Sequence, residues 1–172
     1  DVCGPHVELK DKTGAPVSCE DEIAELLRQI QGGKIAAVKG LGGFHLVCDA
    51  ANAVAVSELR RRKHRPFKPF AVMTLNDLSA SRFVRISEKA SKELHSPQAP
   101  IVLCPKTNDA DRLLPGIAPE LNRIGIMMPY TPIHWLLFFE AIGRPEDPDW
   151  YKKECDLVLV MTSANAGGEP LV

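Results

Sequence analysis

The chain has 172 residues, of which 45% are hydrophobic and 25% are charged, and its formal net charge at pH 7 is −1. This length and composition are ordinary for a folded domain with a hydrophobic core, and they exclude a disordered or fibrous chain. A net charge so close to zero means that any phosphate or nucleic acid must be bound by a local cluster of cations, not by the field of the whole chain.

The first half of the chain predicts two helices and two short strands after an irregular segment. Residues 1–17 carry turn residues and little apolar periodicity, so we expect a linker with one short strand over residues 6–9. Beyond Ser18, apolar residues recur at helical spacing until Gly32 and Gly33, which are expected to end the helix. The other elements expected here are a strand over 34–40, a strand over 43–50 and a helix over 53–63 with Asn52 as its N-cap.

The second half alternates further short strands with helices. Its predicted strands cover residues 69–75, 99–106, 123–130 and 155–165. Its predicted helices cover 76–84, 87–96 with Ser87 as N-cap, and 133–143 with Pro132 at the first helical position. The last helix is apolar nearly all round, so it is expected to pack on several sides. This alternation predicts an α/β fold with one mixed sheet in which some strand pairs are parallel.

The cysteines and the apolar runs indicate the compartment. Five cysteines, Cys3, Cys19, Cys48, Cys104 and Cys155, are an odd number without a pairing rhythm, so a disulfide scaffold is not expected. Cys48 and Cys104 lie inside apolar runs and are expected to be reduced core residues. No apolar run approaches the roughly 20 residues of a membrane helix, and the polar start lacks a signal-peptide pattern. The sequence therefore predicts a cytoplasmic protein that does not bind a membrane.

A cluster of cations lies at residues 60–68, where six of nine positions are Lys or Arg. The three arginines at 60–62 fall in the last turn of a predicted helix, and we expect them to be solvated cations that favour the negative end of the helix dipole. Lys63 and Arg65 follow that helix, just before Pro66. A rigid turn there would hold an ammonium and a guanidinium group side by side, as a polyphosphate requires.

The last predicted strand ends in neutral polar side chains, Thr162, Ser163 and Asn165, which are followed by Gly167 and Gly168. In α/β sheets, ligands usually bind at strand ends. Hydroxyl and amide groups can hydrogen-bond to phosphate or ribose oxygens, and glycines let the backbone come close. A polar turn that satisfies its own backbone is the alternative interpretation.

A glycine-rich segment, KGLGGF, joins the first two predicted strands. It matches neither the P-loop nor the dinucleotide-binding fingerprint, and no G-x-S-x-G hydrolase signature occurs in the chain. The five histidines are too scattered to define a metal site. His45 follows the glycines directly and is a candidate to face a substrate.

Together, K-x-R at residues 63–65 and S-x-N at residues 163–165 resemble the paired active-site signature of the YrdC-like fold, and the resemblance covers roughly residues 18–172. It implies an α/β fold whose twisted mixed sheet is flanked by helices and has a concave nucleotide-binding groove. It also implies binding of ATP with Mg2+ and the formation of carbamoyl-type adenylates.

Within that superfamily, four segments resemble the hydrogenase maturation carbamoyltransferases, the HypF family: KGLGGFHLVCDA, RRRKHRPFKPFAVM, IGIMMPYTPIHWLL and MTSANAGGEPL. This resemblance implies that the chain makes carbamoyl-adenylate from ATP and carbamate, the carbamate being derived from carbamoyl phosphate. The carbamoyl group would then pass to HypE, on the way to the cyanide ligands of NiFe hydrogenase.

The resemblance also implies roles for particular residues. Lys63 and Arg65 would hold the triphosphate and stabilise departing pyrophosphate, while Ser163, Asn165 and Thr162 would anchor phosphate or ribose oxygens. The carbamate pocket would be lined by Lys39, Gly42, Gly43 and His45. The helix N-terminus at Thr131 and Pro132 could favour an anion.

The resemblance further implies a domain organisation. Cys3 is similar to the last ligand of a zinc-knuckle module that precedes this domain in the family, so residues 1–17 would be a linker and 18–172 a C-terminally truncated adenylation domain. A structural zinc takes four ligands, so zinc is expected only in the full-length protein and no metal site within this chain.

Two other functions stay open. A YrdC-like fold with a basic concave surface could instead bind double-stranded RNA, and that binding would depend on the arginines at 60–62 as well as on Lys63 and fall steeply with salt. The chain could also make the threonylcarbamoyl-adenylate used in tRNA modification. The segment KGLGGFHL argues against this, because Gly40 and Gly42 stand where that branch carries threonines.

Overall fold

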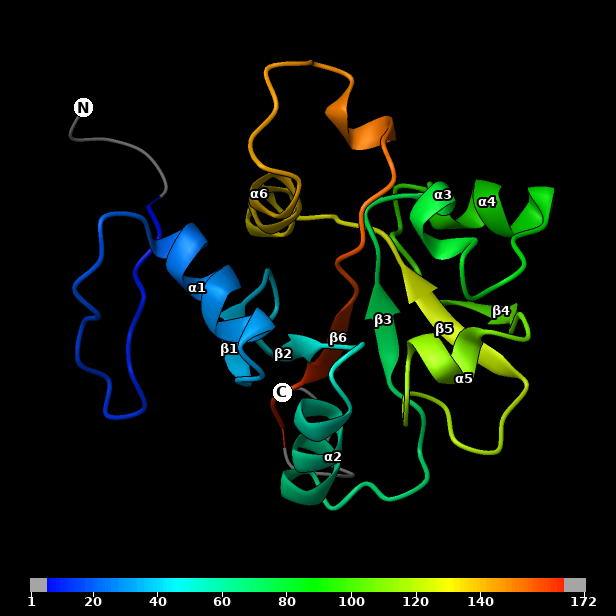
Figure 1. Cartoon of the computed structure of the whole chain (residues 1–172), viewed down its shortest axis with the longest axis horizontal. Coiled ribbons are helices and arrows are strands. Elements are labelled where there is room, and N and C mark those ends of the chain that lie inside the picture. The colour runs from blue at the N-terminus through cyan, green and yellow to red at the C-terminus, as the bar shows by residue number, and fades with distance from the viewer. Residues whose placement is uncertain (1–5, 166–172) are drawn as a thin grey trace.

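A computed structural model of the chain describes residues 6–165 (Figure 1). Cys3, Gly167 and Gly168 therefore lie outside the described residues. The helices are α1 Glu22–Gln31, α2 Ala53–Arg62, α3 Asp77–Ala80, α4 Glu88–Leu94, α5 Ala110–Leu113 and α6 Pro132–Ala141, with a 3-10 turn, η1, at Trp150–Lys152. The strands are β1 Ala36–Lys39, β2 Phe44–Asp49, β3 Ala71–Met73, β4 Val102–Pro105, β5 Arg123–Met127 and β6 Leu159–Ser163.

The six strands form one sheet in the order β1-β2-β6-β3-β5-β4. Strands β3 and β5 are parallel, and the other four neighbouring pairs are antiparallel. The predicted mixed α/β sheet is therefore confirmed. Strand β6 comes last in the chain but pairs in the middle of the sheet, between β2 and β3, so its end meets segments from the first half of the sequence.

Helices cover both faces of the sheet. One apolar core packs the sheet against α2 to α5, and its largest members include Leu59, Phe70 and Phe83. The second core packs the opposite face against α1 and α6, with Ile30, Leu137 and Phe138 at its centre. In Figure 1, α1 and α6 lie on the upper left of the sheet, and α2 lies below it. We call these two sides the α2 face and the α6 face.

Capping residues in the sequence determine where several of the helices begin. Asn52 and Ser87 cap α2 and α4 as predicted, because their side chains accept hydrogen bonds from backbone N–H groups of the first turn. Helix α1 begins later than Ser18 suggested: Asp21 is its N-cap and accepts from the N–H groups of Ile23 and Ala24. Cys48 and Cys104 are buried free thiols in the core, as predicted.

Three features differ from the predicted elements. No strand covers residues 6–9 of the described chain, and the isolated bridge nearest to them joins Lys10 and Pro16. The short α5 and η1 were not predicted, since a single turn carries too little periodicity. Helix α6 is not packed all round, because Trp135 is 37% exposed and turns its ring edge-on toward Trp150. Among the described residues, no helix is both long and apolar enough to cross a bilayer.

Candidate functional site

The end of β6 carries polar side chains to both faces of the sheet. Side chains alternate along a strand, so neighbours in sequence point to opposite faces. Ser163 lies directly across the ladder from His45 of β2, and these two side chains share the α6 face. Thr162 pairs with Leu46, which packs on the core of the α2 face. A ligand at the end of β6 can therefore be contacted from both sides.

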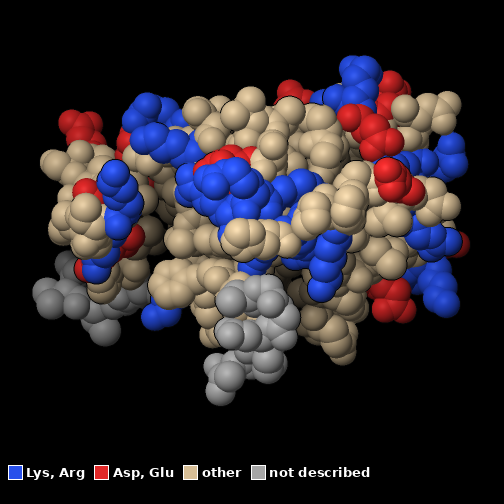
Figure 2. Space-filling model, turned by 90° about the horizontal axis from the view of Figure 1, so that it is seen from below, with Lys and Arg blue, Asp and Glu red and all other residues tan. Residues whose placement is uncertain are grey.

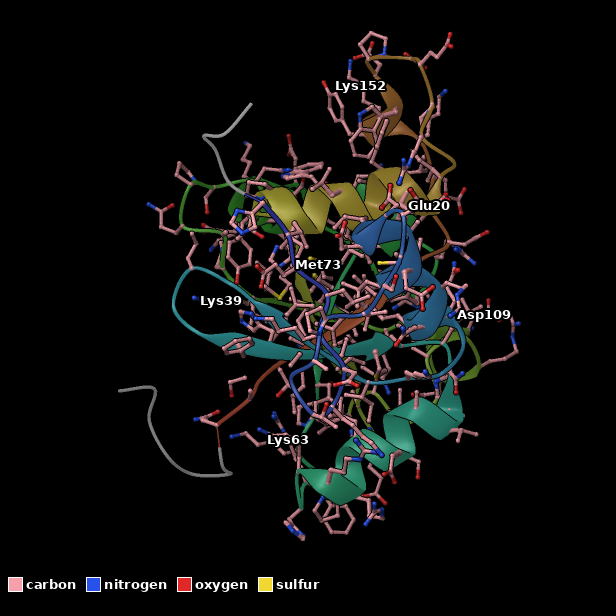
Figure 3. The ribbon with its side chains drawn as sticks, turned by 90° about the vertical axis from the view of Figure 1, so that its left-hand side faces the viewer. Glu20, Lys39, Lys63, Met73, Asp109 and Lys152 are labelled. Atoms are coloured by element: carbon pink, nitrogen blue, oxygen red, sulfur yellow. The ribbon has the colours of Figure 1, made fainter. Side chains whose placement is uncertain are left out.

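Lys63 connects α2 to the end of β6. It is the C-cap residue of α2, and its Nζ donates to the carbonyl oxygens of Ser163 and Asn165, each at 2.7 Å. Lys63 and Ser163 are 100 residues apart in sequence. Partial burial, together with the charge of Arg65, lowers the pKa of the Lys63 ammonium. Figure 3 shows Lys63 at the end of α2, beside the chain that leaves β6.

Arg65 also contacts the end of β6, through hydrogen bonds of its guanidinium group. Its Nη1 donates to Thr162 Oγ1 at 3.2 Å, and its Nη2 donates to the Pro69 carbonyl at 2.6 Å. The guanidinium carbon lies 5.0 Å from the centre of the Phe70 ring. Its Nε is buried and has no hydrogen-bond partner in the structure. The two predicted motifs, K-x-R and S-x-N, are thus brought together by the hydrogen bonds that Lys63 and Arg65 donate to the end of β6.

Ser163 and Asn165 interact with each other at the end of β6, where Ser163 Oγ donates to Asn165 Oδ1. These neutral oxygens, with Thr162 Oγ1, are the kind of group that orients phosphate or ribose hydroxyls. Within residues 6–165, no group of three or more His, Cys, Asp or Glu side chains could hold a metal ion.

The three arginines at 60–62 do not behave alike, and for Arg60 the prediction of a solvated cation is wrong. Its guanidinium donates to five backbone carbonyls, those of Arg65, Pro66, Lys68, Gly116 and Ile117, at 2.7 to 3.2 Å. It also lies over the Phe70 ring, at 4.7 Å from its centre. Arg60 therefore holds the segment that carries Arg65.

Arg61 and Arg62 are exposed, as predicted, and both pair with Glu58 one helical turn back. Their hydrogen bonds, that of Arg61 first, lower the pKa of the Glu58 carboxyl to about 2. Figure 2 shows basic side chains gathered at the centre of the lower face, with acidic atoms beside them. Part of this basic patch is therefore already neutralised.

The glycine-rich turn between β1 and β2 is held by a hydrogen bond from the Gly40 N–H to the Gly43 carbonyl at 2.7 Å. A Cβ atom on Gly40 would lie 3.1 Å from the His45 ring, so this glycine makes room for the imidazole. A Cβ atom on Gly42 would meet nothing within 4 Å. Lys39 pairs with Phe44 and therefore points to the face opposite His45. The strand register therefore separates the side chains of Lys39 and His45, two of the predicted carbamate residues. Figure 3 shows Lys39 apart from Lys63.

His134 was not singled out by the sequence, yet it is buried in α6, which packs on the same face of the sheet as His45. It lies in the first turn of α6 and is 1% exposed, and its Nε2 is buried without a partner. Burial, with the nearby His45 as the second cause, lowers its pKa to about 4. Burial also lowers the pKa of His45. The sequence indicates the burial of His134 only through its helical spacing to Leu137 and Phe138, which places all three residues on the buried side of α6.

The stability of the protein should fall as the pH is lowered from 7 to 5. In the unfolded chain His134 binds a proton below about pH 6.5, whereas in the folded chain it stays neutral down to about pH 4. The unfolded state therefore takes up more protons in this window, and His134 alone should lower the free energy of unfolding by about 2 kcal/mol at pH 5. Urea unfolding at both pH values measures this. His134→Gln should show a smaller pH dependence, and parallel curves for parent and variant would contradict the assignment.

Thr131 is the N-cap residue of α6, as the position before Pro132 suggested, but its side chain makes no capping hydrogen bond. Its Oγ1 is buried and without a partner. Threonine at an N-cap normally satisfies a free N–H of the first turn. Here the Thr131 hydroxyl makes no such bond.

The family model Sua5_yciO_yrdC, described as "Telomere recombination", matches residues 28–172. Carbamoyltransferase HypF2 of Cupriavidus necator is 51% identical over 164 residues, which is 95% of this chain and 20% of that protein. The division of this chain into 1–17 and 18–172 remains a prediction.

Two solved structures are similar over most of the chain. The crystal structure of T. kodakarensis HypF has a TM-score of 0.82 at 39% identity and covers 99% of this chain and 21% of that one. Full-length HypF in the phosphate- and nucleotide-bound form has a TM-score of 0.76 at 39% identity and covers 90% of this chain and 19% of that one. The chain thus spans about a fifth of the length of these relatives. It belongs to the Sua5/YciO/YrdC family and corresponds to the YrdC-like domain of the HypF carbamoyltransferases.

Proposed function

We propose that this chain binds ATP with Mg2+ and forms carbamoyl-adenylate from carbamate that is derived from carbamoyl phosphate. The observation that carries the proposal is the junction of Lys63 and Arg65 with the end of β6. Two cations and several neutral oxygens meet there, which is the chemistry that a triphosphate needs. The nucleotide-bound state named for a solved HypF structure supports the same assignment.

In the proposed reaction, a carboxylate oxygen of carbamate attacks the α-phosphorus of ATP. A new P–O bond forms, the bond between the α-phosphorus and the bridging oxygen breaks, and pyrophosphate leaves with that electron pair. Lys63 and Arg65 neutralise the charge that grows on the leaving group, while Ser163, Thr162 and Asn165 orient phosphate or ribose oxygens. Magnesium bound with the triphosphate would add further charge neutralisation.

The longer relatives would use this product in a second step. We propose that the carbamoyl group passes to HypE during the maturation of NiFe hydrogenase. We also propose a reducing, cytoplasmic location, because Cys48, Cys104 and Cys155 are buried free thiols.

Double-stranded RNA binding is less well supported by the geometry. The arginines at 60–62 are bonded to backbone carbonyls or to Glu58, so few of these cations are left free for phosphates. The threonine-using reaction is also less well supported. A residue with a side chain at Gly40 would press against His45, so the turn observed here suits glycine and not the threonine of the other branch.

Exchange of labelled pyrophosphate into ATP tests the proposed reaction. We expect the chain to catalyse exchange in ammonium bicarbonate, which contains carbamate at equilibrium, and not in sodium bicarbonate. Addition of threonine to sodium bicarbonate should not start the exchange. Exchange that requires threonine would instead assign the chain to threonylcarbamoyl-adenylate synthesis. A folded chain that neither exchanges pyrophosphate nor binds ATP in a calorimetric titration would contradict adenylation.

A further inference from the structure

Two arginine side chains near the outer edge of the sheet have no partner. All ten arginines of the chain lie in the part that the structure describes. Eight of them donate side-chain hydrogen bonds to carbonyl, hydroxyl or carboxylate oxygens. Within residues 6–165, the side chains of Arg85 and Arg123 make neither a hydrogen bond nor an ion pair. These two arginines lie on either side of the same residue, Pro105.

Arg123 of β5 stands across the ladder from Pro105 of β4. The residues next to them, Ile124 and Cys104, are buried in the core on the α2 face. Side chains alternate along a strand, so Arg123 and Pro105 both point to the α6 face. Leu103, two residues before Pro105, points the same way and is 59% exposed. This part of the α6 face is therefore open to solvent.

Arg85 lies on the other side of Pro105. An isolated antiparallel bridge pairs Val84 with Lys106, and the Arg85 N–H donates to the Pro105 carbonyl at 2.8 Å. Val84 is buried in the core on the α2 face, so Arg85, the next residue, points to the α6 face. Neighbouring strands are about 4.8 Å apart, so the backbones of Arg85 and Arg123 are about 10 Å apart. Their long side chains can reach one anion held above Pro105.

A cavity lies at this row of residues. It has a volume of about 420 Å3, and Arg85, Pro105 and Arg123 all line it. Part of its wall is apolar and is formed by Ile86, Ala90 and Leu103. No Asp or Glu among residues 6–165 belongs to its lining. Since guanidinium groups bind phosphate and carboxylate oxygens through paired N–H donors, the cavity offers two anion-binding groups beside an apolar wall.

This cavity is separate from the proposed nucleotide site. Strand β4 is the edge strand, and β5 and β3 lie between it and β6 (Figure 1). Three strand spacings correspond to about 14 Å between β4 and β6. None of Lys63, Arg65 and Ser163 lines the cavity. A ligand bound there would therefore be held in addition to ATP.

We propose that the cavity at Arg85 and Arg123, which we call the arginine-pair site, binds a phosphate monoester with a small apolar body. A phosphate monoester carries close to two negative charges at neutral pH, whereas a carboxylate carries one. The two guanidinium groups bind and neutralise the phosphate, and the apolar wall packs against the organic part. This binding does not depend on the proposed adenylation.

Phenyl phosphate is a suitable probe, because it joins a phosphate dianion to a compact apolar ring. We expect calorimetry to show saturable binding by the parent chain. Arg85→Gln and Arg123→Gln should each weaken it at least about tenfold, since each removes one charged contact. Arg112→Gln is the matched control, because Arg112 is exposed and pairs with Asp109 away from the cavity. Its affinity should stay within about twofold of the parent.

Other probes test the chemistry of the site. Benzoate should bind at least about tenfold more weakly than phenyl phosphate, because it carries one charge. Inorganic phosphate should bind at least about threefold more weakly, because it lacks the apolar ring. Lowering the pH from 7.5 to 5.5 should weaken phenyl phosphate, since a phosphate monoester takes up a proton near pH 6 while guanidinium groups stay charged.

Lys63→Met separates this site from the nucleotide site. This variant should bind phenyl phosphate within about twofold of the parent. Absence of saturable binding by the folded parent, or parent-like affinity in Arg85→Gln and Arg123→Gln, would overturn the arginine-pair site. Binding that Lys63→Met loses and the two arginine variants keep would place the phosphate at the end of β6, which also overturns it.

Discussion

Lys63→Met should abolish most of the affinity for ATP with Mg2+, with a dissociation constant about 30- to 150-fold above that of the parent. The ammonium group lies against the end of β6 with two carbonyl acceptors, and it has a third N–H for a phosphate oxygen. Loss of a charged hydrogen bond and of one positive charge next to a triphosphate accounts for an effect of about 2 to 3 kcal/mol, which corresponds to this change in affinity. Calorimetric titration measures it directly.

Lys68 supplies the matched control. It lies on the same segment and is exposed, so Lys68→Met removes the same charge from the protein without touching the end of β6. Its affinity for ATP should stay within about threefold of the parent at physiological salt, where distant surface charges are screened. Equal losses in the two variants would mean that general attraction, and not the position of Lys63, binds the nucleotide. Circular dichroism of each variant verifies that it is folded.

Arg60→Ala should destabilise the protein by about 3 kcal/mol, far more than is usual for a residue in a surface run of arginines. The substitution removes a guanidinium that donates to five carbonyls, and several of these would be left without a partner. Arg60→Lys should lose most of the same stability, because an ammonium cannot span acceptors on both the 65–68 segment and the Gly116 turn. Urea unfolding measures the loss.

Arg61→Ala and Arg62→Ala are the controls for Arg60, since both side chains are exposed and pair only with Glu58 in the structure described. Each should change the free energy of unfolding by no more than about 0.5 kcal/mol. Arg60→Ala should also weaken ATP binding, because the segment that Arg60 holds carries Arg65. An Arg60 variant as stable as the Arg61 variant would contradict the role described for its hydrogen bonds.

Much of the fold could be predicted because its signals are local. The apolar spacing of α1, the caps Asn52 and Ser87, and the short apolar runs of the strands each depend on a few adjacent residues. The same holds for the two motifs at 63–65 and 163–165, whose residue types already indicate phosphate chemistry. The sequence by itself also indicated a mixed α/β sheet, through the alternation of strands and helices.

The remaining features depend on contacts between distant parts of the chain. Arg60 looks like its two neighbours in the sequence, but its acceptors at Gly116 and Ile117 lie 56 and 57 residues away. His134 lies on the same face of the sheet as His45 only because α6 packs over the face to which β2 turns that side chain.

Lys39 was grouped with His45 by proximity in the sequence, and the strand register separates the two. The amino-acid sequence thus determined most of the elements and the caps Asn52 and Ser87, and its motifs predict phosphate chemistry. Only the order of the strands, their register and the pleat decided which of the polar side chains share a site, because those depend on pairing and packing across the whole sheet and not on local preference.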